Sequence, residues 1–185
     1  MTRPLVGLTL LALAACGGGA TKPAVAGVEG NVIAGTQFQP VSANFTTANN
    51  HLYLYLTDRA DICTRLQSSN AQLASTKALI FDTFNATGFA QAAPFSPGTF
   101  SAYTGLPKLT GRQVSALYQS NDSACNASTK VFADGGTVEV TSYTEGQSVS
   151  GNFTLSVAGA TVRGFFTASY CGFDVTRGMS TACEL

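Results

Sequence analysis

Strict alternation of apolar and polar residues marks the last third of the chain. In the segments 148–157 and 161–170, nearly every second residue is apolar or glycine, and most residues between them are Ser, Thr or Asn. This period of two is typical of a β-strand with one buried and one solvated face. The segment 137–143 follows the same pattern, and short glycine-containing turns separate the three segments, as in tight hairpins. We therefore predict a three-stranded antiparallel meander whose inward side chains form part of the core: Val149, Phe153, Leu155, Val162 and Phe166.

Upstream, the alternation is weaker but recurs. The segment 51–56 has three leucines on one face and His51, Tyr53 and Tyr55 on the other, so we expect a central strand that is covered on both faces. Further candidate strands are 25–33, 37–46, 76–84, 99–104 and 113–119, and we interpret the polar segment 120–134 as a long loop.

One short helix is predicted after residue 57. Asp58 is a plausible N-cap, Ile62, Cys63 and Leu66 form an apolar stripe, and the polar residues 68–70 end the helix. A single short helix among many strands predicts an all-β fold, namely one antiparallel β-sandwich or β-barrel of about eight or nine strands.

The amino terminus predicts export and lipidation. Arg3 precedes a short apolar run that ends in Leu13-Ala14-Ala15-Cys16, which resembles the lipobox of bacterial lipoproteins. A transmembrane helix needs about 20 apolar residues and this run is shorter; a plain secretory signal is the closer alternative. The resemblance implies a signal peptide over 1–15, a lipidated Cys16 with a flexible tether over 16–23, and one β-domain over 24–185.

Composition narrows the function classes. Ten basic residues balance ten acidic residues, and only 11% of the chain is charged. Because no basic stripe is present, the sequence favours neither nucleic acid nor anionic lipid headgroups as partners.

The cysteines predict disulfides rather than a metal site. Five cysteines are present, and four remain after Cys16, an even number that is typical of two disulfides in an exported protein. Four cysteines allow three pairings; we favour Cys125 with Cys171 and Cys63 with Cys183, and the main rival exchanges Cys63 and Cys125. With no C-x-x-C motif and a single histidine, we expect neither a metal nor a cofactor.

The sequence contains few candidate catalytic or ligand-binding residues. His51 is the only imidazole, no G-x-S-x-G motif is present, and we assign no catalytic residue. Asp82 alternates with Ile80 and Phe84 on a face that the pattern indicates to be buried, where a carboxylate needs a partner. Tyr53 and Tyr55 could form a ligand-binding face, although tyrosines more often fill the second side of a central strand.

Three motifs resemble a group of small bacterial lipoproteins. These are Gly136-Thr137-Val138, the run V-S-G-N-F-T-L at 149–155, and the run G-F-F-T-A-S-Y-C at 164–171. The resemblance implies a disulfide-containing β-domain on a lipid anchor, and it implies no activity.

Together these features predict a membrane-anchored lipoprotein of the cell envelope, in the outer membrane and facing either the periplasm or the surface. We expect a non-enzymatic binding or structural role, with an envelope protein or a glycan as partner. The alternative is an exported carbohydrate- or peptide-directed hydrolase that uses strand carboxylates such as Asp82.

We predict that Cys16→Ser abolishes acylation, typically with palmitate, and leaves an unprocessed precursor, because the lipid is attached to that sulfur and cleavage follows. Metabolic labelling with a fatty acid, together with the mass of the purified chain, measures both. Normal cleavage of the variant to a soluble chain would contradict the lipobox assignment.

Overall fold

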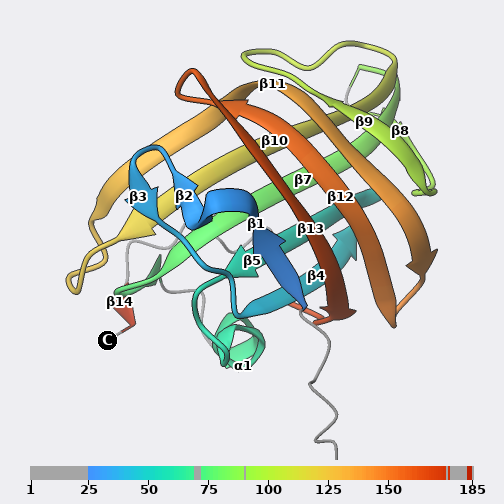
Figure 1. Ribbon diagram of the computed structural model, residues 1–185. Helices are drawn as coiled ribbons and strands as arrows, with labels where there is room; N and C mark the ends of the chain where they lie inside the picture. The colour runs from blue at the N-terminus through green and yellow to red at the C-terminus, as the bar shows by residue number, and fades with distance from the viewer. Residues whose placement is uncertain (1–24, 69–71, 90, 174, 176–182, 185) are drawn as a thin grey trace, which may run out of the picture.

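The computed structural model describes residues 25–68, 72–89, 91–173, 175 and 183–184 (Figure 1). The predicted signal peptide, Cys16 and the tether 16–23 lie outside these residues. The described residues fold mainly into one ten-stranded sheet, and α1 (Ile62–Ser68) is the α-helix among them. The all-β class with one short helix is therefore confirmed.

The large sheet has the spatial order β1-β13-β12-β11-β9-β10-β7-β5-β4, with β8 beside β7. Its strands are β1 (Ala26–Val28), β4 (Ser42–Ala48), β5 (His51–Thr57), β7 (Lys77–Gly88), β8 (Gln91–Ala93), β9 (Gly98–Ala102), β10 (Gly111–Asn121), β11 (Ala127–Thr144), β12 (Ser148–Val157) and β13 (Ala160–Tyr170). Two short pairs complete the fold: β2 (Val32–Ile33) with β3 (Thr36–Gln37), and β6 (Gln72–Leu73) with β14 (Cys183–Glu184).

The sheet closes on itself because β4, at one end of this order, also pairs with β13, the strand next to the other end. The end of β13 pairs with β4, with Ser169 opposite Asn44 and Tyr170 opposite Phe45. We predicted either a β-sandwich or a β-barrel, and a sheet closed in this way is a barrel. The pairing is parallel, as is that of β9 with β10, so the sheet is mixed and not purely antiparallel. Hairpins force antiparallel neighbours, whereas strands joined by closure are free of that constraint.

The predicted meander is present, and the side chains that we predicted to face inward do so. β12 covers the expected residues and β13 begins one residue earlier, and the five side chains assigned to the core are each no more than 3% exposed. The first half of β11, however, is a strand where we expected the loop 120–134. Three polar residues in succession, Ser128, Thr129 and Lys130, interrupt the alternation there, but this half pairs with β10, with Leu117 opposite Phe132.

The interior is packed around three phenylalanine rings from opposite walls of the closed sheet. The ring centroid of Phe81 on β7 lies 5.4 Å from that of Phe153 and 6.4 Å from that of Phe166. Each of these two rings, Phe153 and Phe166, occupies the space above a glycine. A Cβ on Gly151 would lie 2.7 Å from the Phe166 ring and would also meet the Glu139 carbonyl. A Cβ on Gly164 would collide with Phe153. The glycines therefore make room for the rings.

The two ends of the closed sheet are also filled. At one end, Ile33 and Phe38 from the segment around β2 and β3 are buried, and Phe38 meets Tyr118 edge-to-face with centroids 5.6 Å apart. At the other end, Phe95 stacks on Phe100 with centroids 5.4 Å apart. The N-terminal segment and the connection between β8 and β9 thus extend the core beyond the strands.

The short helix begins later than its predicted cap. α1 starts at Ile62, and Asp58 instead accepts a hydrogen bond from the backbone N–H of Lys77 at 2.8 Å. Asp58 therefore ties the end of β5 to the start of β7. Asp61, immediately before the helix, pairs with Arg65 at 2.8 Å.

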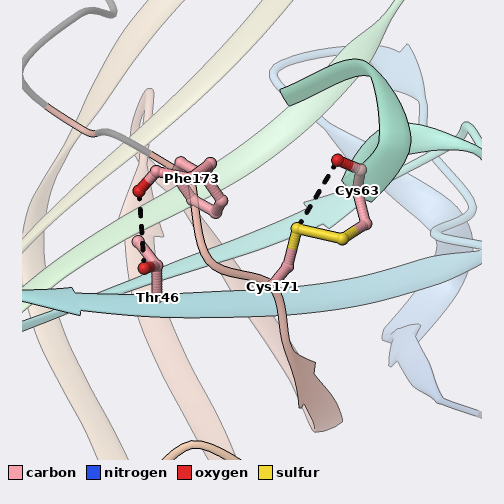
Figure 2. Close-up of a disulfide and its surroundings, with 4 residues drawn as sticks. All are labelled: Thr46, Cys63, Cys171 and Phe173. Carbon is pink, nitrogen blue, oxygen red and sulfur yellow. Dashed lines mark hydrogen bonds between the residues drawn. A yellow bond between two sulfur atoms is a disulfide. The ribbon is translucent and has the colours of Figure 1, made fainter. Parts of the chain in front are cut away.

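Cys63 on α1 is bonded to Cys171 at the end of β13, with a Cα–Cα distance of 5.8 Å (Figure 2). Our favoured pairing of Cys125 with Cys171 and of Cys63 with Cys183 is therefore wrong, and the observed bond is one of the two in the rival pairing. The parallel closure explains the error: the backbone N–H of Cys171 donates to the carbonyl of Phe45 at 2.7 Å, which brings the end of β13 beside β4, where α1 also packs. The loop that we expected to carry Cys125 to Cys171 is in fact a tight turn followed by β11.

We predict that the second disulfide joins Cys125 to Cys183. Cys125 is disulfide-bonded and lies in the turn after Asp122, whose carbonyl accepts from the backbone N–H of Ser75 at 2.8 Å. Cys183 pairs through its backbone with Gln72, three residues before Ser75. Non-reducing peptide mapping should yield this link and the Cys63–Cys171 link; a fragment joining Cys63 to Cys183 would contradict both.

Candidate functional site

The ligand-binding residues proposed from the sequence lie together on the outer face of the closed sheet. On β5 and β7, Tyr53 is directly opposite Asp82 and Tyr55 is directly opposite Ile80. Their inward neighbours, Leu54 and Phe81, belong to the core. The expectation that Asp82 lies on a buried face is therefore wrong: it is on the outer face with a side chain that is 32% exposed.

Asp82 has a specific partner that sequence reasoning did not assign. The Nδ1 atom of His51 lies 2.7 Å from Oδ1 of Asp82. Because an ionised carboxylate only accepts hydrogen bonds, Nδ1 carries the hydrogen and Nε2 is left for another contact. The imidazole also stacks on Phe84, with centroids 4.5 Å apart, so its orientation is fixed by both contacts.

A third tyrosine completes the site from beyond β10, the strand that separates β7 from β9. Tyr103 follows β9, and its ring meets Phe84 edge-to-face with centroids 6.1 Å apart. It also forms a hydrogen bond with Ser115, which is opposite Asp82 on β10. We call the following residues the Tyr–Asp–His cluster: His51, Tyr53, Tyr55, Asp82 and Tyr103.

The chain beyond the disulfide forms one border of the cluster. Phe173 meets Tyr55 edge-to-face with centroids 5.1 Å apart, and its carbonyl accepts a hydrogen bond from Oγ1 of Thr46 at 3.5 Å (Figure 2). Thr46 points to the outer face yet is only 2% exposed, because this segment lies over it. The Cys63–Cys171 bond lies two residues before Phe173 and therefore fixes this border.

The tyrosines of the cluster keep their protons well above neutral pH. The pKa of Tyr53 and that of Tyr55 are each raised to about 12, chiefly because burial desolvates the phenol and then because of the Asp82 carboxylate. The pKa of Tyr103 is raised for the same two reasons, although its hydrogen bond to Ser115 acts in the opposite direction. All three phenols are therefore neutral donors and acceptors at physiological pH.

This arrangement of side chains is suited to binding a ligand. Tyrosine offers a flat apolar ring and a hydroxyl, which together bind partners that carry both apolar faces and polar edges. The carboxylate and the imidazole add one strong acceptor and one further polar atom, held in place by their mutual hydrogen bond. Within the described ranges, no group of three or more His, Cys, Asp or Glu side chains is placed to hold a metal ion.

The sequence pattern predicts part of this cluster. The alternation in 51–56 placed His51, Tyr53 and Tyr55 on one face, which the structure confirms. The pattern could not show that Asp82 faces the same side, because β7 carries apolar residues on both of its faces. Tyr103 falls within the predicted strand 99–104, whereas β9 ends at Ala102; the sequence could not show that this segment lies across β10 from Asp82.

No protein-family model, no curated protein and no solved structure matches this chain. Among the residues that the structure describes, no helix has the length and apolar character required to span a membrane.

We predict that the Asp82→Asn substitution lowers the pKa of Tyr53 from about 12, but not to its ordinary value of 10.0, because desolvation is the larger cause and remains. NMR titration of isotope-labelled tyrosine rings measures this. Glu145→Gln is the matched control, since Glu145 acts on Tyr143 and not on Tyr53. An unchanged Tyr53 titration in Asp82→Asn would contradict the proximity of the two groups.

The same shifts determine the sign of the alkaline pH dependence. Between pH 10 and pH 12 the folded chain retains phenolic protons that the unfolded chain has lost. The free energy of unfolding therefore falls as pH rises through this window.

Proposed function

We propose that this protein is a lipid-anchored component of the bacterial cell envelope that binds an envelope glycan through the Tyr–Asp–His cluster. The observation that carries the proposal is the row of neutral tyrosines around the Asp82–His51 pair on a half-exposed face of the sheet.

The anchor is proposed from the sequence. The lipobox that ends at Cys16, the glycine-rich residues that follow it, and the resemblance to small bacterial lipoproteins all support a domain tethered to a membrane, which we place in the outer membrane. The Cys63–Cys171 disulfide supports an oxidising compartment, although less specifically.

The chemistry of the cluster supports a glycan as partner. Sugar rings have apolar faces that pack on aromatic rings and hydroxyl edges that need both donors and acceptors. The neutral phenols supply both roles, and Asp82 supplies a strong acceptor. A polyanionic partner such as nucleic acid would instead require clustered Arg or Lys, which none of the five cluster residues supplies.

The hydrolase alternative depends on the same aspartate. A glycosidase of the usual kind places two carboxyl groups about 5–10 Å apart across the scissile bond. Of the five residues in the cluster, Asp82 alone is a carboxylate. We therefore propose binding without hydrolysis, and the experiment below separates the two roles.

Full-length protein purified in detergent is applied to an array of bacterial envelope glycans. We expect Tyr53→Ala, Tyr103→Ala and Asp82→Asn each to weaken binding at least about tenfold, which corresponds to roughly 1.4 kcal/mol. The control is Phe132→Ala, an aromatic residue that is 52% exposed on β11 outside the cluster and should leave binding unchanged.

Retention of binding in all three cluster variants, or absence of binding to every glycan by the wild-type protein, would contradict the proposal. Cleavage of a bound glycan by the wild-type protein but not by Asp82→Asn would establish the hydrolase instead.

A further inference from the structure

A cavity of about 210 Å³ lies at the end of the closed sheet where β4 turns into β5. We call it the mouth pocket, and the residues used below line it: Thr47, Asn49, Asn50, Phe95, Tyr143 and Glu145.

The mouth pocket shares no residue with the Tyr–Asp–His cluster, although Ala48 in its lining is opposite His51. Thr47 is opposite Leu52, a core residue, so it belongs to the inner face of the sheet, whereas the cluster occupies the outer face. Tyr143 packs on the core residue Phe45 with centroids 6.1 Å apart, so the inner end of the pocket adjoins the core.

The apolar side of the pocket is held by contacts between aromatic rings. Phe95 stacks on the buried Phe100 and meets Tyr143 edge-to-face with centroids 5.0 Å apart. The turn above it is held as well: Asn50 donates from Nδ2 to the carbonyl of Ala92 at 2.8 Å. A pocket whose walls are fixed before binding loses little conformational entropy when a ligand enters.

The polar side of the pocket is rich in hydrogen-bonding groups and carries a single charge. Asn49 and Asn50 contribute carboxamides, Thr47 a hydroxyl and Glu145 a carboxylate, which is the only charged group in the lining. The Glu145 carboxylate also contributes, after desolvation, to a raised pKa of Tyr143. A ligand that fits these groups carries several hydroxyls and no negative charge.

The volume limits the ligand to one ring. Pockets for drug-sized molecules usually measure about 300–1,000 Å³, and the mouth pocket is smaller. We propose that the mouth pocket binds a single neutral or amino-substituted sugar ring, with Glu145 accepting from its hydroxyl or ammonium group, and that it rejects acidic sugars. This site is additional to the glycan face proposed above and does not depend on it.

The test is an NMR titration of isotope-labelled full-length protein in detergent with glucose, glucosamine and glucuronate. We expect saturable shifts of the Asn49 and Asn50 side-chain amide signals with glucose and glucosamine and none with glucuronate. Glu145→Gln removes the charge from an exposed position; it should weaken glucosamine binding at least fivefold and permit glucuronate to bind.

Asp82→Asn, in the separate cluster, should leave these titrations unchanged, which distinguishes failure of the mouth pocket from failure of the glycan face. The inference is overturned if neither glucose nor glucosamine shifts the Asn49 and Asn50 signals saturably. It is also overturned if glucuronate binds the wild-type protein as well as glucose does, or if Glu145→Gln changes no affinity.

Discussion

The close packing of phenylalanine rings over glycines inside the closed sheet is the constraint on which this structure depends. Phe166 lies against Gly151 of the neighbouring strand, Phe153 lies against Gly164, and both rings reach Phe81 on the opposite wall. A small closed sheet has a narrow interior that side chains must fill without overlap. Large rings fit there only because residues without a Cβ stand opposite them, so the alternation of glycine and phenylalanine determines how closely the strands approach.

Closure determines where the functional groups lie. Because the inner face is filled with apolar side chains, the polar and aromatic residues of β5 and β7 are left for the outer face, where His51, Tyr53 and Asp82 meet. The junction of β13 with β4 brings Cys171 to Cys63, and the chain that follows covers one side of the cluster. Cys63 and Cys171 are separated by 108 residues in the sequence, and the chain-entropy account gives a stabilisation of about 4.7 kcal/mol for a loop of roughly 100 residues. The disulfide therefore supports both the closure and the border of the site.

The parts of this fold that the sequence predicted are those governed by local periodicity. Strands β12 and β13, with Phe153 and Phe166 inward, follow from a period of two that one sheet face imposes on neighbouring residues. The closure of the sheet was not predictable, because β4 and β13 are far apart in the sequence and share no turn. The disulfide and the position of Asp82 follow from that closure and from strand parity. The sequence therefore offered the Cys63–Cys171 bond only within the rival pairing, and it placed Asp82 on the wrong face. The first half of β11 was missed because residues such as Ser128 and Lys130 have a low preference for strands, and pairing with β10 overrides that preference.

The central claim is tested most directly by measuring the free energy of unfolding of Gly151→Ala beside that of Gly135→Ala, by urea denaturation with the disulfides intact. A Cβ at position 151 would meet the Phe166 ring and a backbone carbonyl, whereas a Cβ at position 135 on β11 meets nothing within 4 Å. We expect Gly151→Ala to lower the free energy of unfolding by about 1–3 kcal/mol, and Gly135→Ala to change it by no more than about 0.5 kcal/mol. Equal stability of the two variants would contradict the account of a core built by rings packed over glycines.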